Sequence, residues 1–85
     1  MRERIKQVMG SIFGLPADQV PDDASVDRVS QWDSLRHLEL MLALEGAFSV
    51  RISTDAMLEL LSLQNIEKFM ETQRISTGGE SDGVG

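Results

Sequence analysis

The residues best placed to do chemistry stand together in Gln31-Trp32-Asp33-Ser34-Leu35, where a long loop ends and an apolar helix is expected to begin. Asp33 is a good N-cap, because its carboxylate can accept the free amide hydrogens of the first helical turn. Ser34 follows in that turn, where unpaired amide hydrogens and a partial positive charge favour an attached anion. The Ser34 hydroxyl is therefore well placed to carry a phosphodiester. The same residues also form an ordinary helix start, and the physical argument alone favours that plainer interpretation.

Catalysis and metal binding are poorly supported by the remaining polar residues. Ser34 and His37 are three residues apart on one helix, but a nucleophilic dyad also needs an orienting acid, an oxyanion hole and a pocket. We therefore expect no catalytic residue and a protein that is not an enzyme. His37 is the only nitrogen ligand, there is no cysteine, and Asp22, Asp23 and Asp27 do not follow the spacing of a calcium loop. These acids predict a solvated acidic loop and no metal site.

Composition limits the kinds of partner. The 85 residues are enough for one small domain, and 8 Lys and Arg against 14 Asp and Glu give a net charge of −6. This charge disfavours nucleic acid, which needs a cationic surface. Apolar stretches are too short for a transmembrane helix, and no secretory signal follows Met1. We expect a cytoplasmic monomer that neither binds nucleic acid nor inserts into a membrane, with proteins as its partners.

Four helices are expected around the Ser34 site. Apolar residues at three- and four-residue spacing predict helices at 2–13, 34–48, 54–61 and 63–74. Gly14 is a natural stop for the first helix, and Ser62 can cap the last. A short helical turn is possible at Pro16-Ala-Asp-Gln. The Gly-rich segment 76–85 is expected to be a disordered tail after a domain spanning 1–75. The fold class is therefore all-α.

Two further expectations concern packing. The long loop 14–33 contains spaced apolar residues, so we expect it to lie against the core; they are Leu15, Val20, Val26 and Val29. Such a long connection tends to be functional. In the 34–48 helix the expected apolar face follows Leu35, Leu38, Leu42 and Phe48, widened by Met41 and Leu44. Trp32, the only tryptophan, is expected to pack within the loop, the alternative being contact with a dedicated partner.

Asp33-Ser34-Leu35, followed by Leu38-Glu39-Leu40 and Leu42-Ala43-Leu44-Glu45, resembles the acyl carrier protein family. The order of elements over residues 2–74 also matches that family. The resemblance implies a four-helix bundle of the acyl-carrier type, with a long first loop and a short third helix. With this resemblance, a Ser34 that carries a phosphodiester becomes the favoured interpretation, in place of an ordinary helix start.

The resemblance implies one covalent site, with 4′-phosphopantetheine attached to Ser34. Asp33 matches the acid used in recognition by the phosphopantetheinyl transferase, and Leu35 matches a position shared between the core and partner contact. The positions where the second helix meets partners or edges the acyl chamber are Leu38, Glu39, Met41 and Glu45. Further residues expected to line that chamber, or simply to form core, are Leu42, Phe48, Ile52, Leu58 and Leu61.

The function implied by the resemblance is to hold acyl groups as thioesters and deliver them to enzymes of fatty-acid, polyketide or related biosynthesis. The expected partners are the transferase, an acyl ligase or acyltransferase, a ketosynthase and other pathway enzymes. Two alternatives stay open. One is an aminoacyl or peptidyl carrier of the same fold, although such carriers more often have Gly-Gly-His or Gly-Gly-Asp before the serine. The other is an unmodified helical interaction module without cargo.

The sequence also departs from the carriers of fatty-acid synthesis, in which an acid commonly follows Asp-Ser-Leu. Arg36 and His37 stand there instead, and Glu39 and Glu45 against Arg36 give residues 34–48 a formal charge of only −1. Arg51 adds a cation to the following connector. Because charge complementarity sets encounter rate and partner choice, enzymes with basic docking patches should bind this chain less well. The departures favour a specialised carrier.

Overall fold

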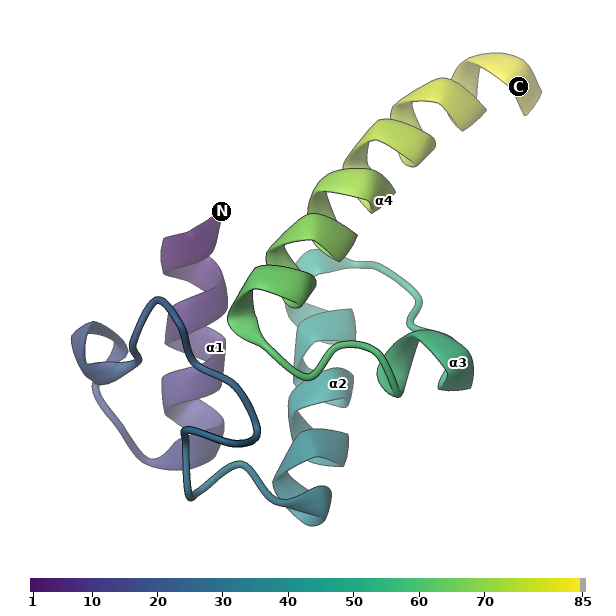
Figure 1. Ribbon diagram of the computed structural model, residues 1–85. Coiled ribbons are helices and arrows are strands. Elements are labelled where there is room, and N and C mark those ends of the chain that lie inside the picture. Colours follow the sequence, from purple (N-terminus) through teal and green to yellow (C-terminus); the bar gives the residue numbers. More distant parts are fainter. Residues whose placement is uncertain (85) are drawn as a thin grey trace.

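A computed structural model describes the backbone of residues 1–84 and the side chains of residues 1–73. It contains α1 (Arg2–Phe13), the 3₁₀ helix η1 (Ala17–Gln19), α2 (Ser34–Phe48), α3 (Thr54–Met57) and α4 (Leu63–Val84). Figure 1 shows α1 and α2 side by side and running in opposite directions, with the long loop beside α1 and α4 crossing in front of α2. The all-α fold expected from the sequence is confirmed.

The ends of the first two helices follow from local signals. Gly14 adopts the left-handed conformation with φ 75°, which ends α1, and its amide donates to the Gly10 carbonyl. Ser49 takes the same role after α2 with φ 53°. The bounds of α1 and α2 agree with the predicted ranges, and η1 lies where a helical turn was expected. Ser53 Oγ accepts the Ala56 amide hydrogen and caps α3. Ser62 Oγ accepts the Asn65 amide hydrogen, so the predicted Ser62 cap of α4 is confirmed.

The third and fourth helices differ from the prediction. α3 ends at Met57, and Leu58 to Leu61 form an irregular connector that allows Leu60 to enter the core. The backbone of α4 continues to Val84, beyond the predicted end near residue 74. The side chains of 74–85 lie outside the described part, so the domain boundary at residue 75 and the disordered tail at 76–85 stay predictions. No helix in the described part of the chain combines the length and hydropathy needed to cross a bilayer.

The long loop packs on the core as expected. Its apolar side chains at Val20, Ala24, Val29 and Trp32 are buried, while Leu15 and Val26 are partly buried against them. The Val26 amide donates to the Leu61 carbonyl at 3.1 Å, and the Leu63 amide donates to the Ala24 carbonyl at 2.9 Å. These two hydrogen bonds flank an isolated antiparallel bridge between Ser25 and Ser62. The loop before α2 is thereby fixed to the segment that precedes α4.

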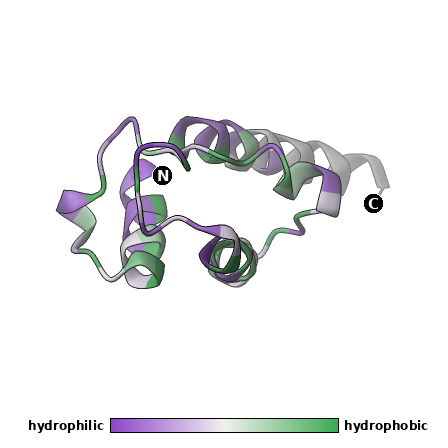
Figure 2. Ribbon diagram, turned by 60° about the horizontal axis from the view of Figure 1, so that its bottom comes forward, coloured by the Kyte–Doolittle hydropathy of each residue, from purple (hydrophilic) through white to green (hydrophobic). Residues whose placement is uncertain are grey.

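The buried face of α2 overlaps the predicted one only in part, at Met41 and Leu44. Leu40, Met41 and Leu44 are fully buried, whereas Leu35, Leu38 and Leu42 are exposed. In Figure 2, where α2 is viewed nearly along its axis, hydrophobic residues occur on more than one side of the helix. Hydropathy therefore does not select a single face, and packing against the other helices selects it. The core residues of α1 and α4 follow the three- and four-residue spacing that predicted these helices and include Ile5, Met9, Phe13, Leu63, Ile66 and Met70.

An ion pair joins the beginning of α1 to α4. Arg2 donates from Nε to Glu67 Oε2 at 3.1 Å and from an Nη atom to Glu67 Oε1 at 2.7 Å. This hydrogen bonding to Arg2 lowers the pKa of the Glu67 carboxyl. A lowered folded-state pKa stabilises the fold above the ordinary pKa of glutamate, and this contribution is lost as the pH falls through the folded-state value.

Glu67→Gln should therefore lower the melting temperature at pH 7 by less than a core truncation does, since the pair is partly exposed. The difference between Glu67→Gln and wild type should shrink as the pH falls through the lowered pKa of the Glu67 carboxyl, where the wild-type group becomes protonated. Thermal unfolding across a series of pH values from 7 downward measures this. Glu71→Gln, an exposed glutamate on the same helix, is the control. A pH-independent difference would contradict the assignment.

Candidate functional site

The first turn of α2 is held by Asp33. The Asp33 backbone is extended, and its Oδ1 accepts the Arg36 amide hydrogen at 2.9 Å, while the Asp33 carbonyl accepts the His37 amide hydrogen at 2.8 Å. Asp33 Oδ2 also lies 3.6 Å from the Arg36 guanidinium. The predicted N-cap is confirmed, and it places Ser34 at the first helical position.

The Ser34 side chain is open to solvent at this position. Ser34 and Leu35 are both exposed, and the Ser34 hydroxyl makes no hydrogen bond to another described residue. The amide hydrogens of Ser34 and Leu35 likewise have no acceptor in the described part of the chain. Free amide hydrogens at a helix N-terminus, with the Arg36 guanidinium on the same turn, suit a phosphate group attached to the hydroxyl oxygen.

A surface hollow of about 380 Å³ lies directly beside Ser34. Val26 and Trp32 contribute from the long loop, and Leu61 contributes from the connector before α4. Asp33, Ser34 and His37 supply its polar side from the start of α2. The hollow therefore offers apolar walls next to an exposed hydroxyl, which suits an arm that carries both polar and apolar parts.

Trp32 anchors the end of the long loop. Its side chain is only 3% exposed, and its ring centroid lies 5.4 Å from that of Phe13 on α1. The indole Nε1–H donates to His37 Nδ1 at 2.9 Å, and His37 Nε2 lies 2.8 Å from the Met57 carbonyl oxygen. The expected packing role of Trp32 is confirmed. The role of His37 in joining these elements was not expected from the sequence.

A stripe of exposed leucines runs along the solvent side of α2. Leu35 is 65% exposed and Leu42 is 59% exposed. Leu38 lies one helical turn after Leu35, and Leu42 lies two turns after Leu35. The neighbouring segment adds two further exposed leucines, Leu58 and Leu61. We call Leu35, Leu38, Leu42, Leu58 and Leu61 the leucine surface. Leu38 and Glu39, both expected at a partner contact, are accessible to one.

Two other expected partner residues face the protein itself. Met41 is fully buried among core side chains, so it is not accessible to a partner, and the alternative that it edges an acyl chamber stays a prediction. Glu45 is partly buried, and its Oε2 accepts the Ile52 amide hydrogen at 2.8 Å, so its carboxylate fixes the connector after α2. Ile52 is buried and Phe48 partly buried, which places both in or against the core.

The exposed charges around the leucine surface are mixed. Arg36 flanks it on α2, Arg51 is exposed in the connector, and Glu39 is the exposed acid of α2. The Glu45 carboxylate is bonded to the Ile52 amide and partly buried, so it is held against the connector after α2. The solvent side of α2 is therefore apolar with little net charge.

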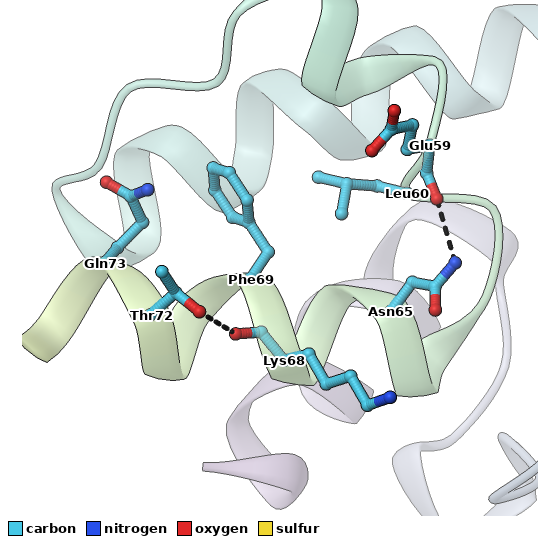
Figure 3. A pocket seen from close by; sticks show the side chains of 7 residues that line it. All are labelled: Glu59, Leu60, Asn65, Lys68, Phe69, Thr72 and Gln73. Atoms are coloured by element: carbon cyan, nitrogen blue, oxygen red, sulfur yellow. Dashed lines mark hydrogen bonds between the residues drawn. The ribbon is translucent and has the colours of Figure 1, made fainter.

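A second hollow, of about 440 Å³, lies along α4 away from these residues. Figure 3 shows Phe69 and Leu60 directed into it, with Asn65 donating to the Glu59 carbonyl and Thr72 donating to the Lys68 carbonyl. These polar groups are thus engaged with the backbone of the protein. None of the residues that line this hollow also lines the hollow beside Ser34.

Asp33→Ala should test the cap. Loss of the carboxylate that accepts the Arg36 amide hydrogen should lower the free energy of unfolding by about 1 kcal/mol. We also expect slower modification of Ser34, because the helix start that presents it frays. Urea unfolding and a time course of modification measure the two effects. Asp33→Asn retains a capping oxygen and should recover the stability; unchanged modification of both variants would leave Asp33 with a structural role alone.

The family comparison agrees with this geometry. A family model described as a phosphopantetheine attachment site matches residues 3–70. The match spans nearly all of α1, the long loop, α2, α3 and the first turns of α4, and so includes Ser34 and both of its flanking elements. The chain therefore belongs to the family of phosphopantetheine-carrying carrier proteins, whose cofactor is a covalently attached 4′-phosphopantetheine.

Proposed function

We propose that Ser34 is the phosphopantetheine attachment site and that the protein is an acyl carrier for fatty-acid, polyketide or related biosynthesis. The observation that supports this most directly is the exposed, unbonded Ser34 hydroxyl at the first position of α2. Modification requires an enzyme to reach this oxygen, and no described side chain occupies it by hydrogen bonding. Carrier domains of this family are generally non-catalytic, so bond-making belongs to the partner enzymes.

The residues around Ser34 suit each part of the attached group. The amide hydrogens of Ser34 and Leu35 and the Arg36 guanidinium favour its phosphate. The apolar walls of the hollow beside Ser34, including Val26 and Leu61, suit its uncharged arm. When bound, the group supplies a terminal thiol that carries an acyl group as a thioester. Tethering of this kind raises the effective concentration of the cargo at each partner's active site.

The leucine surface is the proposed docking surface for the transferase and the pathway enzymes. Leu35 follows Ser34 directly and Leu61 lines the hollow beside it, so a partner that covers these leucines has access to the hydroxyl. With little net charge on this side, docking depends more on apolar contact than on long-range attraction. An acyl ligase or acyltransferase, or a ketosynthase, would then recognise this carrier by the shape of an apolar groove.

Incubation of the unmodified protein with coenzyme A and a broad-specificity phosphopantetheinyl transferase tests the proposal. Intact-mass spectrometry should show the addition of one phosphopantetheine group. The modified protein can then be offered acyl and aminoacyl ligases with their substrates. Formation of an acyl thioester supports the proposal, whereas an aminoacyl thioester alone would make the chain an aminoacyl carrier. No mass increase in the folded protein would contradict modification at Ser34.

A further inference from the structure

The hydrogen bonds of His37 fix the protonation of its ring. A tryptophan indole can only donate, so His37 Nδ1, 2.9 Å from Trp32 Nε1, must be the acceptor. A backbone carbonyl can only accept, so His37 Nε2, 2.8 Å from the Met57 oxygen, must carry the hydrogen. The ring is therefore neutral with its hydrogen on Nε2. Only this state of the ring allows both hydrogen bonds at the same time.

These two bonds connect three parts of the fold. Trp32 ends the long loop and packs on Phe13 of α1, His37 belongs to the first turns of α2, and Met57 is the last residue of α3. α3 has only four residues and no fully buried side chain, so it depends on its neighbours. The Glu45–Ile52 hydrogen bond secures the chain before α3, and the His37–Met57 hydrogen bond secures its end.

The same ring borders the attachment site. His37 and Trp32 line the hollow beside Ser34, together with Leu61 from the connector that follows α3. A change in the Trp32–His37 contact therefore alters the wall of this hollow.

We propose that His37 is a proton-sensitive clamp, which joins the Trp32 loop to α3 while the imidazole is neutral and releases that connection when the ring is protonated. Protonation adds a hydrogen to Nδ1, which then faces the indole N–H as a second donor with no acceptor between them. The Trp32–His37 bond is lost, while Nε2–H can still donate to the Met57 carbonyl. The clamp stands on the unmodified chain, and its effect on cargo beside Ser34 rests on the proposed function.

The charged groups on the packed elements do not replace the lost acceptor. Asp33, the N-cap of α2, and Arg36, the residue before His37, have side chains 3.6 Å apart that engage one another. Asp55 is exposed in the first turn of α3, and Glu59 is exposed in the connector that follows it. In the described part of the chain, none of these groups forms a hydrogen bond or ion pair with the His37 ring.

The sequence makes the clamp directly measurable, because Trp32 is the only tryptophan and His37 the only histidine. In nuclear magnetic resonance of the unmodified protein, the His37 ring signals are followed across a pH range that includes protonation of the ring. The Trp32 indole N–H should shift with the same midpoint and, below it, exchange with solvent roughly tenfold faster. Amide signals of 54–57 should move with that midpoint. An indole signal that stays constant while His37 titrates would overturn the proposal.

Two matched variants separate a clamp from simple packing. His37→Gln offers an acceptor and a donor that do not titrate in this range, so its indole N–H should stay protected at both ends of the pH range. His37→Phe retains an aromatic ring without either bond, so its indole N–H should exchange rapidly at every pH. Equal protection in wild type and His37→Phe at pH 8 would overturn the clamp. No coenzyme A or transferase is used, so this result is independent of the test for modification at Ser34.

Discussion

Ser34→Ala should abolish the mass increase that wild-type protein shows with coenzyme A and a phosphopantetheinyl transferase. The variant lacks the hydroxyl oxygen that forms the phosphodiester, so the expected loss is complete. Folding should be unchanged, because the side chain is exposed and hydrogen-bonded to no described residue. Intact-mass spectrometry measures the modification, and circular dichroism during heating measures the stability.

Ser30→Ala is the matched control for this experiment. Ser30 is another exposed serine, four residues earlier in the loop, and its hydroxyl lies 3.3 Å from the Gln31 side-chain oxygen. The Ser30→Ala variant should be modified at the wild-type rate. A mass increase retained in Ser34→Ala would move the attachment site to another residue, and its loss in Ser30→Ala would show that the loop rather than the hydroxyl is limiting.

Leu44→Ala and Leu42→Ala should differ strongly in stability although they are two residues apart on α2. Leu44 is fully buried, so its truncation leaves a cavity and should cost about 2–5 kcal/mol of the free energy of unfolding. Leu42 is 59% exposed, so its truncation should change stability by less than about 0.5 kcal/mol. Urea unfolding followed by circular dichroism measures both.

The effect on modification should follow the opposite order, with a loss for a change at Leu42 and none for a mild change at Leu44. Leu42→Ala removes part of the leucine surface and should raise the concentration of carrier needed for half-maximal modification. Leu44→Val, a milder core change that keeps more of the fold intact, should leave that concentration at the wild-type value. Equal losses of stability for the two alanine variants, or unchanged kinetics for Leu42→Ala, would contradict the division of α2 described above.

Local signals were sufficient to locate α1, α2 and the helix start that carries Ser34. Gly14 at the end of α1 and Asp33 at the start of α2 determine those boundaries through contacts within a few residues of themselves. The position of Ser34 in the first turn follows from the Asp33 cap alone. Prediction succeeded there because the determining interactions are short in sequence separation.

The orientation of α2 could not be predicted in the same way. Leucines occupy positions 35, 38, 40, 42 and 44, with Met41 among them, so several faces of the helix are equally apolar. Which face is buried depends on the positions of α1, the long loop and α4, which hydropathy along one helix does not encode. The apolar spacing therefore put Leu35, Leu38 and Leu42 on the expected apolar face, and the resemblance put the buried Met41 at a partner contact or the edge of an acyl chamber.

The links of His37 were missed for a related reason. A bond from Trp32 to His37 spans five residues, but the one from His37 to Met57 spans twenty. The sequence held one signal, a tryptophan placed before a helix with a histidine in its first turns. That spacing allows a hydrogen bond across the helix start, although the acceptor on α3 could be identified only in three dimensions.

The separation of the two sides of α2 has a consequence for how such carriers diversify. Leu35, Leu38 and Leu42 can be exchanged without loosening the interior formed by Leu40, Met41 and Leu44. A descendant can therefore acquire a new preference among enzymes by single replacements, with no poorly folded intermediate along the way. The same independence allows a protein engineer to transplant recognition residues from another carrier onto this helix and retain the original scaffold.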